Sequence, residues 1–226
     1  MEEFQIMNFH THYLSAILVL IAVSFPTSLI GIFFKLNLGK ISGILPNALS
    51  YLLFVIIAFF TGYIGSINYN ISIYFVILAF ITSFVCIGIE IFEAMLIHFF
   101  KYKFWIKKIK VHEIINKNNV FFDIIIILIG ALCEEIIFRQ VFFNILYNIL
   151  GVDIFIVIII SAFIYSVNHI YFGANAVFQK FIIGIIYSLL FVYSSFSIIA
   201  PAITHFLQNF ILYILSFRRN KREELN

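Results

Sequence analysis

The sequence predicts an all-α, polytopic bundle of transmembrane helices, and three observations carry this prediction. Hydrophobic residues make up 63% of the 226 positions and charged residues only 11%, whereas soluble domains carry about a quarter charged residues. Apolar stretches of about 20 residues recur along the chain, each long enough to cross a hydrocarbon core of roughly 30 Å as a helix. Basic residues are confined to alternate connections. A bilayer is therefore the expected solvent, with 1–226 as a single membrane domain.

Seven spans are expected from the apolar stretches. Pro26 and Pro201 fall inside two of them, where neighbouring helices or water can satisfy the carbonyls that a proline leaves free. The predicted ranges are Tyr13 to Phe34, Ala48 to Ile67, Ile71 to Phe100, Phe121 to Leu150, Ile154 to Ile170, Val177 to Tyr193 and Ser197 to Phe217.

The basic residues also predict an orientation. Connections rich in lysine and arginine stay in the cytoplasm, which places the N-terminus outside and the C-terminus in the cytoplasm. An excess of Ile, Phe, Asn, Lys and Tyr is typical of an AT-rich genome and favours a bacterial plasma membrane. The basic residues that carry this prediction are Lys35, Lys40, Lys101, Lys103, Lys107, Lys108, Lys110, Lys117, Lys180 (after the fifth span, at the start of the sixth), Arg218, Arg219, Lys221 and Arg222.

The fourth predicted span carries three ionisable residues, which are costly in a membrane unless they pair or line a wet cavity. Glu135 and Arg139 are four apart and share one helical face, so they can form an ion pair. Glu134 points about 100° away and is left without that partner, which suits a general base. A purely structural role of Glu135 and Arg139 in knitting the bundle together is an equally weighted alternative.

Two histidines and an asparagine add polar groups to later spans. His169 closes the fifth span, and His205 and Asn209 share one face of the seventh, where Pro201 can bend the helix. Counting from the cytoplasmic ends places Glu134 and His205 at similar depths, roughly 20 Å up at 1.5 Å per residue. They could therefore meet. His169 reaches that depth only if the segment after the fifth span sinks into the protein as a cytoplasm-facing funnel.

These residues allow two chemistries. In one, Glu134 activates water while a histidine or an amide stabilises the oxyanion. In the other, His169 and His205 bind a zinc ion with Glu134 and, as an unusual ligand, Asn209, and water takes the open position. Residue types do not separate a zinc enzyme from one without any metal.

The three motifs together resemble the CAAX protease and bacteriocin-processing (CPBP, or Abi) family of membrane endopeptidases. The family's EExxxR is similar to Glu134, Glu135 and Arg139; its FxxxH to Tyr165 and His169; its HxxxN to His205 and Asn209. The resemblance covers roughly 123–209. Tyr165 departs from the family's phenylalanine, and the lead-in to Glu134 lacks the proline of many members.

The resemblance implies hydrolysis of a peptide bond in or beside the membrane, with Glu134, Glu135, Arg139, His169, His205 and Asn209 as the catalytic set. It implies a catalytic core over 120–217 after a variable part over 1–119, and a small membrane-associated peptide or protein as substrate. Expected tasks are bacteriocin or signalling-peptide processing, self-immunity or CAAX-type cleavage. The family has been described both as metalloproteases and as glutamate-dependent enzymes.

Two other functions remain open. One is a non-catalytic membrane scaffold or immunity protein that binds a toxin or a sensor, and the other is a small proton-coupled transporter. No nucleic-acid partner is expected. Glu90 and Glu93 are interpreted as structural residues that snorkel or pair with Lys101 and Lys103, and Cys133 as a small packing residue.

Overall fold

The computed structural model of the protein describes residues 2–69, 71–105 and 119–224, with side chains described between 11 and 217 of these ranges. The described chain is helical and has no strand beyond one isolated bridge between Asn68 and Ser197, which confirms the all-α prediction. The elements are α1 (Glu2–Val23), η1 (Pro26–Leu29), α2 (Ile30–Lys35), η2 (Leu38–Lys40), α3 (Leu45–Phe60), α4 (Ile73–Tyr102), α5 (Val120–Glu135), η3 (Ile136–Val141), η4 (Asn144–Ile149), α6 (Ile154–Val167), η5 (Ile170–Phe172), α7 (Ala174–Tyr193) and α8 (Ile199–Glu224).

Three helices of the described residues are long and apolar enough to cross a membrane, namely Ile73–Tyr102, Ala174–Tyr193 and Ile199–Phe217. A fourth span forms if the bent pair Thr11–Val23 and Pro26–Lys35 is taken as one. The helices Leu45–Phe60 and Ile154–Val167 are apolar but shorter. The protein is therefore a multi-pass membrane protein, while the number of seven spans stays a prediction.

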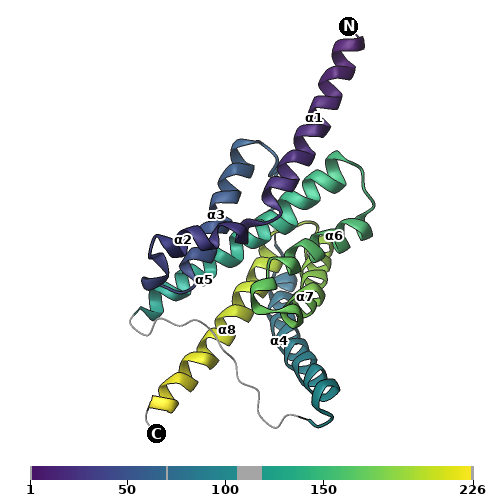
Figure 1. The fold of residues 1–226 in the computed structure, drawn as a ribbon. Helices are drawn as coiled ribbons and strands as arrows, with labels where there is room; N and C mark the ends of the chain where they lie inside the picture. Colours follow the sequence, from purple (N-terminus) through teal and green to yellow (C-terminus); the bar gives the residue numbers. More distant parts are fainter. Residues whose placement is uncertain (1, 70, 106–118, 225–226) are drawn as a thin grey trace.

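The termini lie at opposite ends of the molecule. Figure 1 shows the start of α1 at one end, and the last turns of α4 and α8 toward the other. An odd number of membrane crossings, which the predicted orientation requires, fits this arrangement, but the orientation itself stays a prediction. Several of the basic residues that carry it have side chains outside the described part, namely Lys107, Lys108, Lys110, Lys117, Arg218, Arg219, Lys221 and Arg222.

The predicted first span is broken at Pro26, where the chain bends by 54° between α1 and the helical segment that follows. Asn168, just after α6, holds this break from the side. Its Nδ2 donates to the Ser24 carbonyl at 2.8 Å, and its Oδ1 accepts from the Thr27 hydroxyl at 2.8 Å. A side chain of a neighbouring helix thus satisfies the backbone beside the proline, as a kink in a membrane requires.

Pro201 differs from its prediction. The last helix begins at Ile199, so Pro201 lies in the first turn of α8 and not at an interior position where it would bend the helix. A proline costs nothing there, because the first N–H groups of a helix have no partner within the helix. Pro201 therefore belongs to the first turn of the helix and does not bend it beside His205.

The predicted fourth span is continuous but changes its winding. After Glu135, α5 passes into the π-helical segments η3 and η4, and such segments often occur at functional sites. The Phe138 carbonyl in η3 accepts a hydrogen bond from the Ser161 hydroxyl of α6 at 2.5 Å. This hydrogen bond links the wider π-helical turn of η3 to α6.

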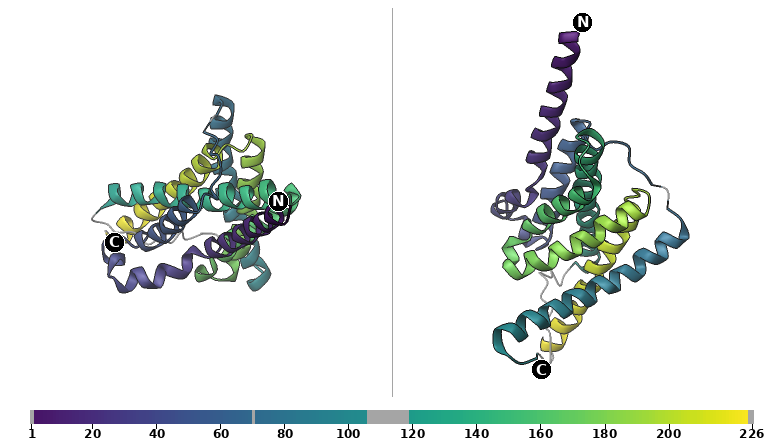
Figure 2. Two further views of the ribbon diagram at one scale, coloured as in Figure 1. Left: turned by 90° about the horizontal axis from the view of Figure 1, so that it is seen from above. Right: turned by 90° about the vertical axis from the view of Figure 1, so that its right-hand side faces the viewer.

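The helices around this element bring distant parts of the sequence together. In the bundle α3 and α8 both pack against α5, α6 packs against α7, and α4 packs against α8. Figure 2 shows α5 with its π-helical extension passing between the N-terminal helices and the group formed by α6, α7 and α8. The polar residues of α5 and η3 are therefore enclosed by helices on several sides.

Gly184 of α7 allows a close contact between α7 and α6. A Cβ atom at this position would lie 3.0 Å from the Tyr165 ring and 3.1 Å from the Cα of Ala162 in α6. We expect Gly184→Ala to lower the free energy of unfolding by about 1–3 kcal/mol, because overpacking forces the two helices apart. Thermal unfolding of the purified protein in detergent micelles measures this loss.

Gly88 in α4 is the matched control, since a Cβ atom added there would have no atom within 4 Å. Gly88→Ala should leave the melting temperature unchanged or raise it slightly, because alanine is the better helix former. Equal melting temperatures for the two variants would contradict the close packing at Gly184.

Candidate active site

A buried ion pair forms the centre of the site. Glu135 ends α5 and Arg139 lies one turn later in η3, and both side chains are 0% exposed. Arg139 Nε lies 3.2 Å from Glu135 Oε2, and Nη1 lies 3.5 Å from Oε1. The predicted pairing of these two residues is therefore present in the structure.

The rest of the Arg139 guanidinium is enclosed by α6 and α7. Nη2 donates to the Gly184 carbonyl at 3.1 Å, and the Tyr165 and Tyr187 rings lie 4.8 Å and 5.3 Å from the guanidinium carbon. A cation near two aromatic faces gains electrostatic stabilisation that replaces part of its lost hydration. The tyrosine at the position of the family's phenylalanine thus packs directly on the arginine.

His205 of α8 joins both glutamates. Its Nδ1 lies 2.7 Å from Glu135 Oε1, and its Nε2 lies 3.9 Å from Glu134 Oε2. The expectation from helix depth that Glu134 and His205 could meet is supported by this distance. The structure adds the bond to Glu135, which gives that carboxylate two partners.

Glu134 has no partner of comparable strength. It is only 5% exposed, and its Oε2 makes no hydrogen bond within the described part of the chain. Other buried polar atoms of the cluster also make no hydrogen bond among the described residues: the Tyr165 hydroxyl, Gln208 Nε2, and the atoms Glu135 Oε2 and Arg139 Nε, which face each other in the ion pair. Unpartnered buried polar atoms are rare in proteins and costly, so they mark places where another group is expected to bind.

His169 lies beside this cluster, and its nearest partner is a tyrosine rather than either glutamate. Its Nδ1 bonds to the Tyr165 carbonyl at 3.0 Å, and its ring lies 4.9 Å from the Tyr165 ring. The same tyrosine ring lies 6.1 Å from the His205 ring. Tyr165 therefore stands between the two histidines, and its turn of α6 positions His169 at the edge of the cluster.

Asn209 is half-buried on α8 and is not joined to the cluster by a hydrogen bond in the described structure. Its neighbour Gln208 is fully buried and accepts a 2.5 Å hydrogen bond from the Tyr187 hydroxyl. The Tyr187 ring in turn lies 5.1 Å from the His205 ring. The third motif thus contributes His205 to the cluster directly, and Gln208 through Tyr187.

The side chains predicted to bind zinc are not grouped as a set of metal ligands in the described part of the chain. Among the described residues, no three side chains of His, Cys, Asp or Glu are grouped so that they could hold a metal ion. His169 is separated from His205 by Tyr165, and Nδ1 of His205 is already bonded to Glu135. The set of His169, His205, Glu134 and Asn209 as zinc ligands therefore stays a prediction, and no catalytic step is derived through it.

Two glutamates of α4 lie outside the cluster. Glu90 pairs with Lys180 of α7 at 2.6 Å and not with Lys101 or Lys103 as predicted, since the packing of α4 on α7 brings Lys180 closer. Glu93 is 6% exposed, and both its carboxylate oxygens lack a hydrogen-bond partner among the described residues. Cys133 is buried and free, as expected for a packing residue.

Three residues of the site were missed by the sequence motifs, namely Tyr187, Gln208 and Gly184. The only sequence signal for Tyr187 and Gln208 is that each is a polar residue inside an apolar span. The only sequence signal for Gly184 is a glycine within a predicted helix. Their roles depend on how α6, α7 and α8 pack, which no single motif records.

The fold and the cluster describe a polytopic helical membrane protein with a buried glutamate–histidine site. Residues 116–211 match the model of the family described as Rce1-like, the type II CAAX prenyl endopeptidase Rce1-like family. This segment carries all three motifs, and its match confirms the resemblance to the CPBP family. No curated protein and no solved structure matches the chain.

The buried pair at the centre of the site can be tested by removing one partner. We expect Arg139→Leu to lower the free energy of unfolding by about 3–5 kcal/mol, because Glu135 is left as an uncompensated buried charge. The double variant Glu135→Leu/Arg139→Leu should recover part of this loss, since it leaves no such charge. Thermal unfolding in micelles compares them, and a double variant less stable than Arg139→Leu would argue against the pair as described.

Proposed function

We propose that the protein is an intramembrane endopeptidase in which Glu134 activates the water that attacks the peptide bond. The observation that carries this proposal is the division between two adjacent buried carboxylates. Glu135 is bound by Arg139 and His205, whereas Glu134 Oε2 has no hydrogen bond among the described residues and faces His205 Nε2 across 3.9 Å. A carboxylate free of partners can accept a proton, and one that is already bound cannot do so easily.

The histidine is oriented by the second carboxylate. With a hydrogen on Nδ1, His205 donates to Glu135 Oε1, and this bond directs Nε2 toward Glu134. The arrangement follows the general logic in which an acid orients an imidazole that acts on a third group. Water bound between Glu134 and His205 would have an acceptor on one side and an imidazole on the other.

Charge supports the same assignment. The two glutamates and Arg139 together carry one net negative charge in an enclosure with almost no exposure, and protonation of His205 brings the total to zero. A protonated imidazole donates from Nε2, so it can stabilise the oxyanion that forms when water attacks the carbonyl. Glu134 then returns the proton that it took from water to the leaving amine.

His169 and Asn209 complete the proposed set as groups at the edge of the cluster. Both are half-buried, so they remain accessible to a peptide that enters beside the buried pair. We propose that they contact the substrate, with an amide or an imidazole as a second oxyanion donor.

The proposed substrate is a small membrane-associated peptide or protein, because the site lies among membrane helices. The matched family is described as a CAAX prenyl endopeptidase family, which supports a CAAX-type cleavage near the C-terminus of a lipidated chain. Bacteriocin or signalling-peptide processing and self-immunity, in a bacterial plasma membrane, are the corresponding bacterial tasks.

Glu134→Gln tests the function directly. A fluorogenic farnesylated peptide that ends in a CAAX sequence is added to purified protein in lipid vesicles, and the released C-terminal tripeptide is measured by mass spectrometry. We expect the variant to lose a factor of about 10²–10⁴ in rate, because an amide cannot accept the proton from water.

Glu93→Gln is the matched control, since Glu93 is 6% exposed against 5% for Glu134 and likewise has an unpartnered carboxylate oxygen among the described residues. It lies on α4, outside the cluster, and should retain the wild-type rate. Full activity of a normally folded Glu134→Gln protein would refute the proposed role and favour the non-catalytic scaffold.

Chelation tests the second chemistry. Because no three-ligand group is present among the described residues, we expect 1,10-phenanthroline to leave the cleavage rate within about twofold of the untreated protein. Metal analysis of the purified protein is the independent measurement. Loss of activity with chelator, restored by stoichiometric zinc, would show that His169 and His205 act as metal ligands instead.

A further inference from the structure

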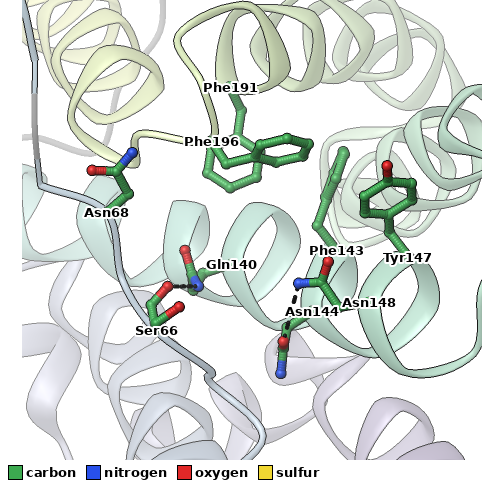
Figure 3. A pocket seen from close by; sticks show the side chains of 9 residues that line it. All are labelled: Ser66, Asn68, Gln140, Phe143, Asn144, Tyr147, Asn148, Phe191 and Phe196. Carbon is green, nitrogen blue, oxygen red and sulfur yellow. Dashed lines mark hydrogen bonds between the residues drawn. The ribbon is translucent and has the colours of Figure 1, made fainter.

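Outside the candidate active site, a polar pocket lies further along the helix that carries the glutamates. It has a volume of about 190 Å³ and lies against η3 and η4, facing the connection between α3 and α4 and the turn between α7 and α8 (Figure 3). None of its nine lining residues is charged; amide side chains such as Gln140 and Asn144 alternate with aromatic rings such as Phe196 and Tyr147. An uncharged lining favours an uncharged ligand.

Gln140 offers this pocket a buried acceptor. Its Nε2 donates to the carbonyls of Ile64 and Ser66, both at 3.0 Å, which fixes the direction of the amide. Its Oε1 then points away from Ser66, as Figure 3 shows, and it has no hydrogen-bond partner in the described part of the chain although the residue is only 7% exposed. A ligand that satisfies this oxygen must present an N–H or O–H donor.

The wall opposite Gln140 is held in an unusual backbone conformation. Ser195 and Phe196 have φ angles of 57° and 60°, a region that non-glycine residues rarely adopt. The Asn68 side chain donates to the Ser195 carbonyl at 2.9 Å, and the Phe196 ring stacks on Tyr147 at 5.9 Å. Strained residues that the surroundings hold in place are common at ligand sites.

The connection between α3 and α4 supplies the remaining wall. Asn144 Nδ2 donates to the Tyr63 carbonyl at 2.9 Å, and Gly65, with a φ of 74°, leaves only 2.7 Å between a hypothetical Cβ and the Asn144 side chain. The segment from Tyr63 to Asn68 lies outside the residues 116–211 that match the family. Seven of the nine lining residues therefore belong to the family segment, and Ser66 and Asn68 lie outside it.

We propose that this pocket is a substrate subsite that binds one uncharged side chain carrying a hydrogen-bond donor, such as glutamine, asparagine or tyrosine. Its volume is comparable to that of the cavities of roughly 150 Å³ that hold a benzene molecule, so it accommodates a single side chain. The inference rests on the proposed peptidase function and names a specificity element of that site.

The distance from Glu134 sets the position of this residue in the substrate. Gln140 follows Glu134 by six residues, which is at most about 9 Å along the helix axis, because an α-helix rises 1.5 Å per residue and the wider π-helical turns of η3 rise less. An extended peptide covers that distance in about three residues. The side chain in the pocket therefore belongs to a residue two to four positions from the scissile bond.

Binding of paired peptides tests the subsite independently of cleavage. Farnesylated, fluorescently labelled peptides carry glutamine or glutamate at each of these positions on the amino side of the scissile bond. Their Kd is measured by anisotropy with full-length Glu134→Gln protein in micelles. At one position we expect the glutamine peptide to bind at least tenfold tighter, because a carboxylate would face Gln140 Oε1 in an uncharged pocket.

Phe196→Gly and Ser195→Gly, each made in the Glu134→Gln protein, distinguish the loss of a side chain that lines the pocket from the effect of relieving the backbone strain. Both substitutions relieve a positive φ, so both should fold, but only Phe196 lines the pocket. We expect Phe196→Gly to abolish the preference for glutamine and Ser195→Gly to keep it. The proposal is overturned if no position shows a preference, if no peptide binds, or if the two glycine variants behave alike. Failure of the proposed peptidase function would give a different result: the wild-type protein would bind these peptides but would not cleave them.

Discussion

The ion pair between Glu135 and Arg139 is the constraint on which the rest of the site depends. Both side chains are completely buried, and removing two charges from water costs several kcal/mol per ion unless their bonding capacity is satisfied. Four elements supply the contacts that offset this cost: η3 carries the arginine, α6 and α7 supply the tyrosine rings and the Gly184 carbonyl, and α8 supplies His205. The close contact at Gly184 and the position of His205 therefore follow from one electrostatic requirement.

This requirement also explains why two adjacent glutamates differ. Consecutive helical residues point about 100° apart, so Arg139 reaches Glu135 and leaves Glu134 facing the histidine. The winding changes to a π-helix directly after the pair, and the Ser161 hydroxyl binds a carbonyl of that segment. A stable pair beside an unsatisfied carboxylate is the division of roles that acid–base chemistry needs, since one group must stay fixed while the other exchanges a proton.

The N-terminal helices take part in the structure of the family segment although they lie outside it. Asn168, just after α6, bonds to Ser24 and Thr27 around the break at Pro26, so the turn that positions His169 is anchored on the first span. Gln140 and Asn144 bond to backbone carbonyls between α3 and α4. In physical terms, the core of 120–217 and the part over 1–119 share hydrogen bonds that neither could satisfy alone in a membrane.

The sequence by itself determined the membrane environment, the all-helical class, the pairing of Glu135 with Arg139 and the separation of Glu134 from that arginine, because these depend on composition and on spacing within one helix. Helix depth also indicated that His205 could reach Glu134. Only the tertiary structure decided that His205 binds Glu135, that Tyr187 and Gln208 join the cluster, that Glu90 pairs with Lys180 and that Pro201 lies in the first turn of its helix. These outcomes depend on which helices pack side by side and where each begins. Spacing within a single helix carries no information about either.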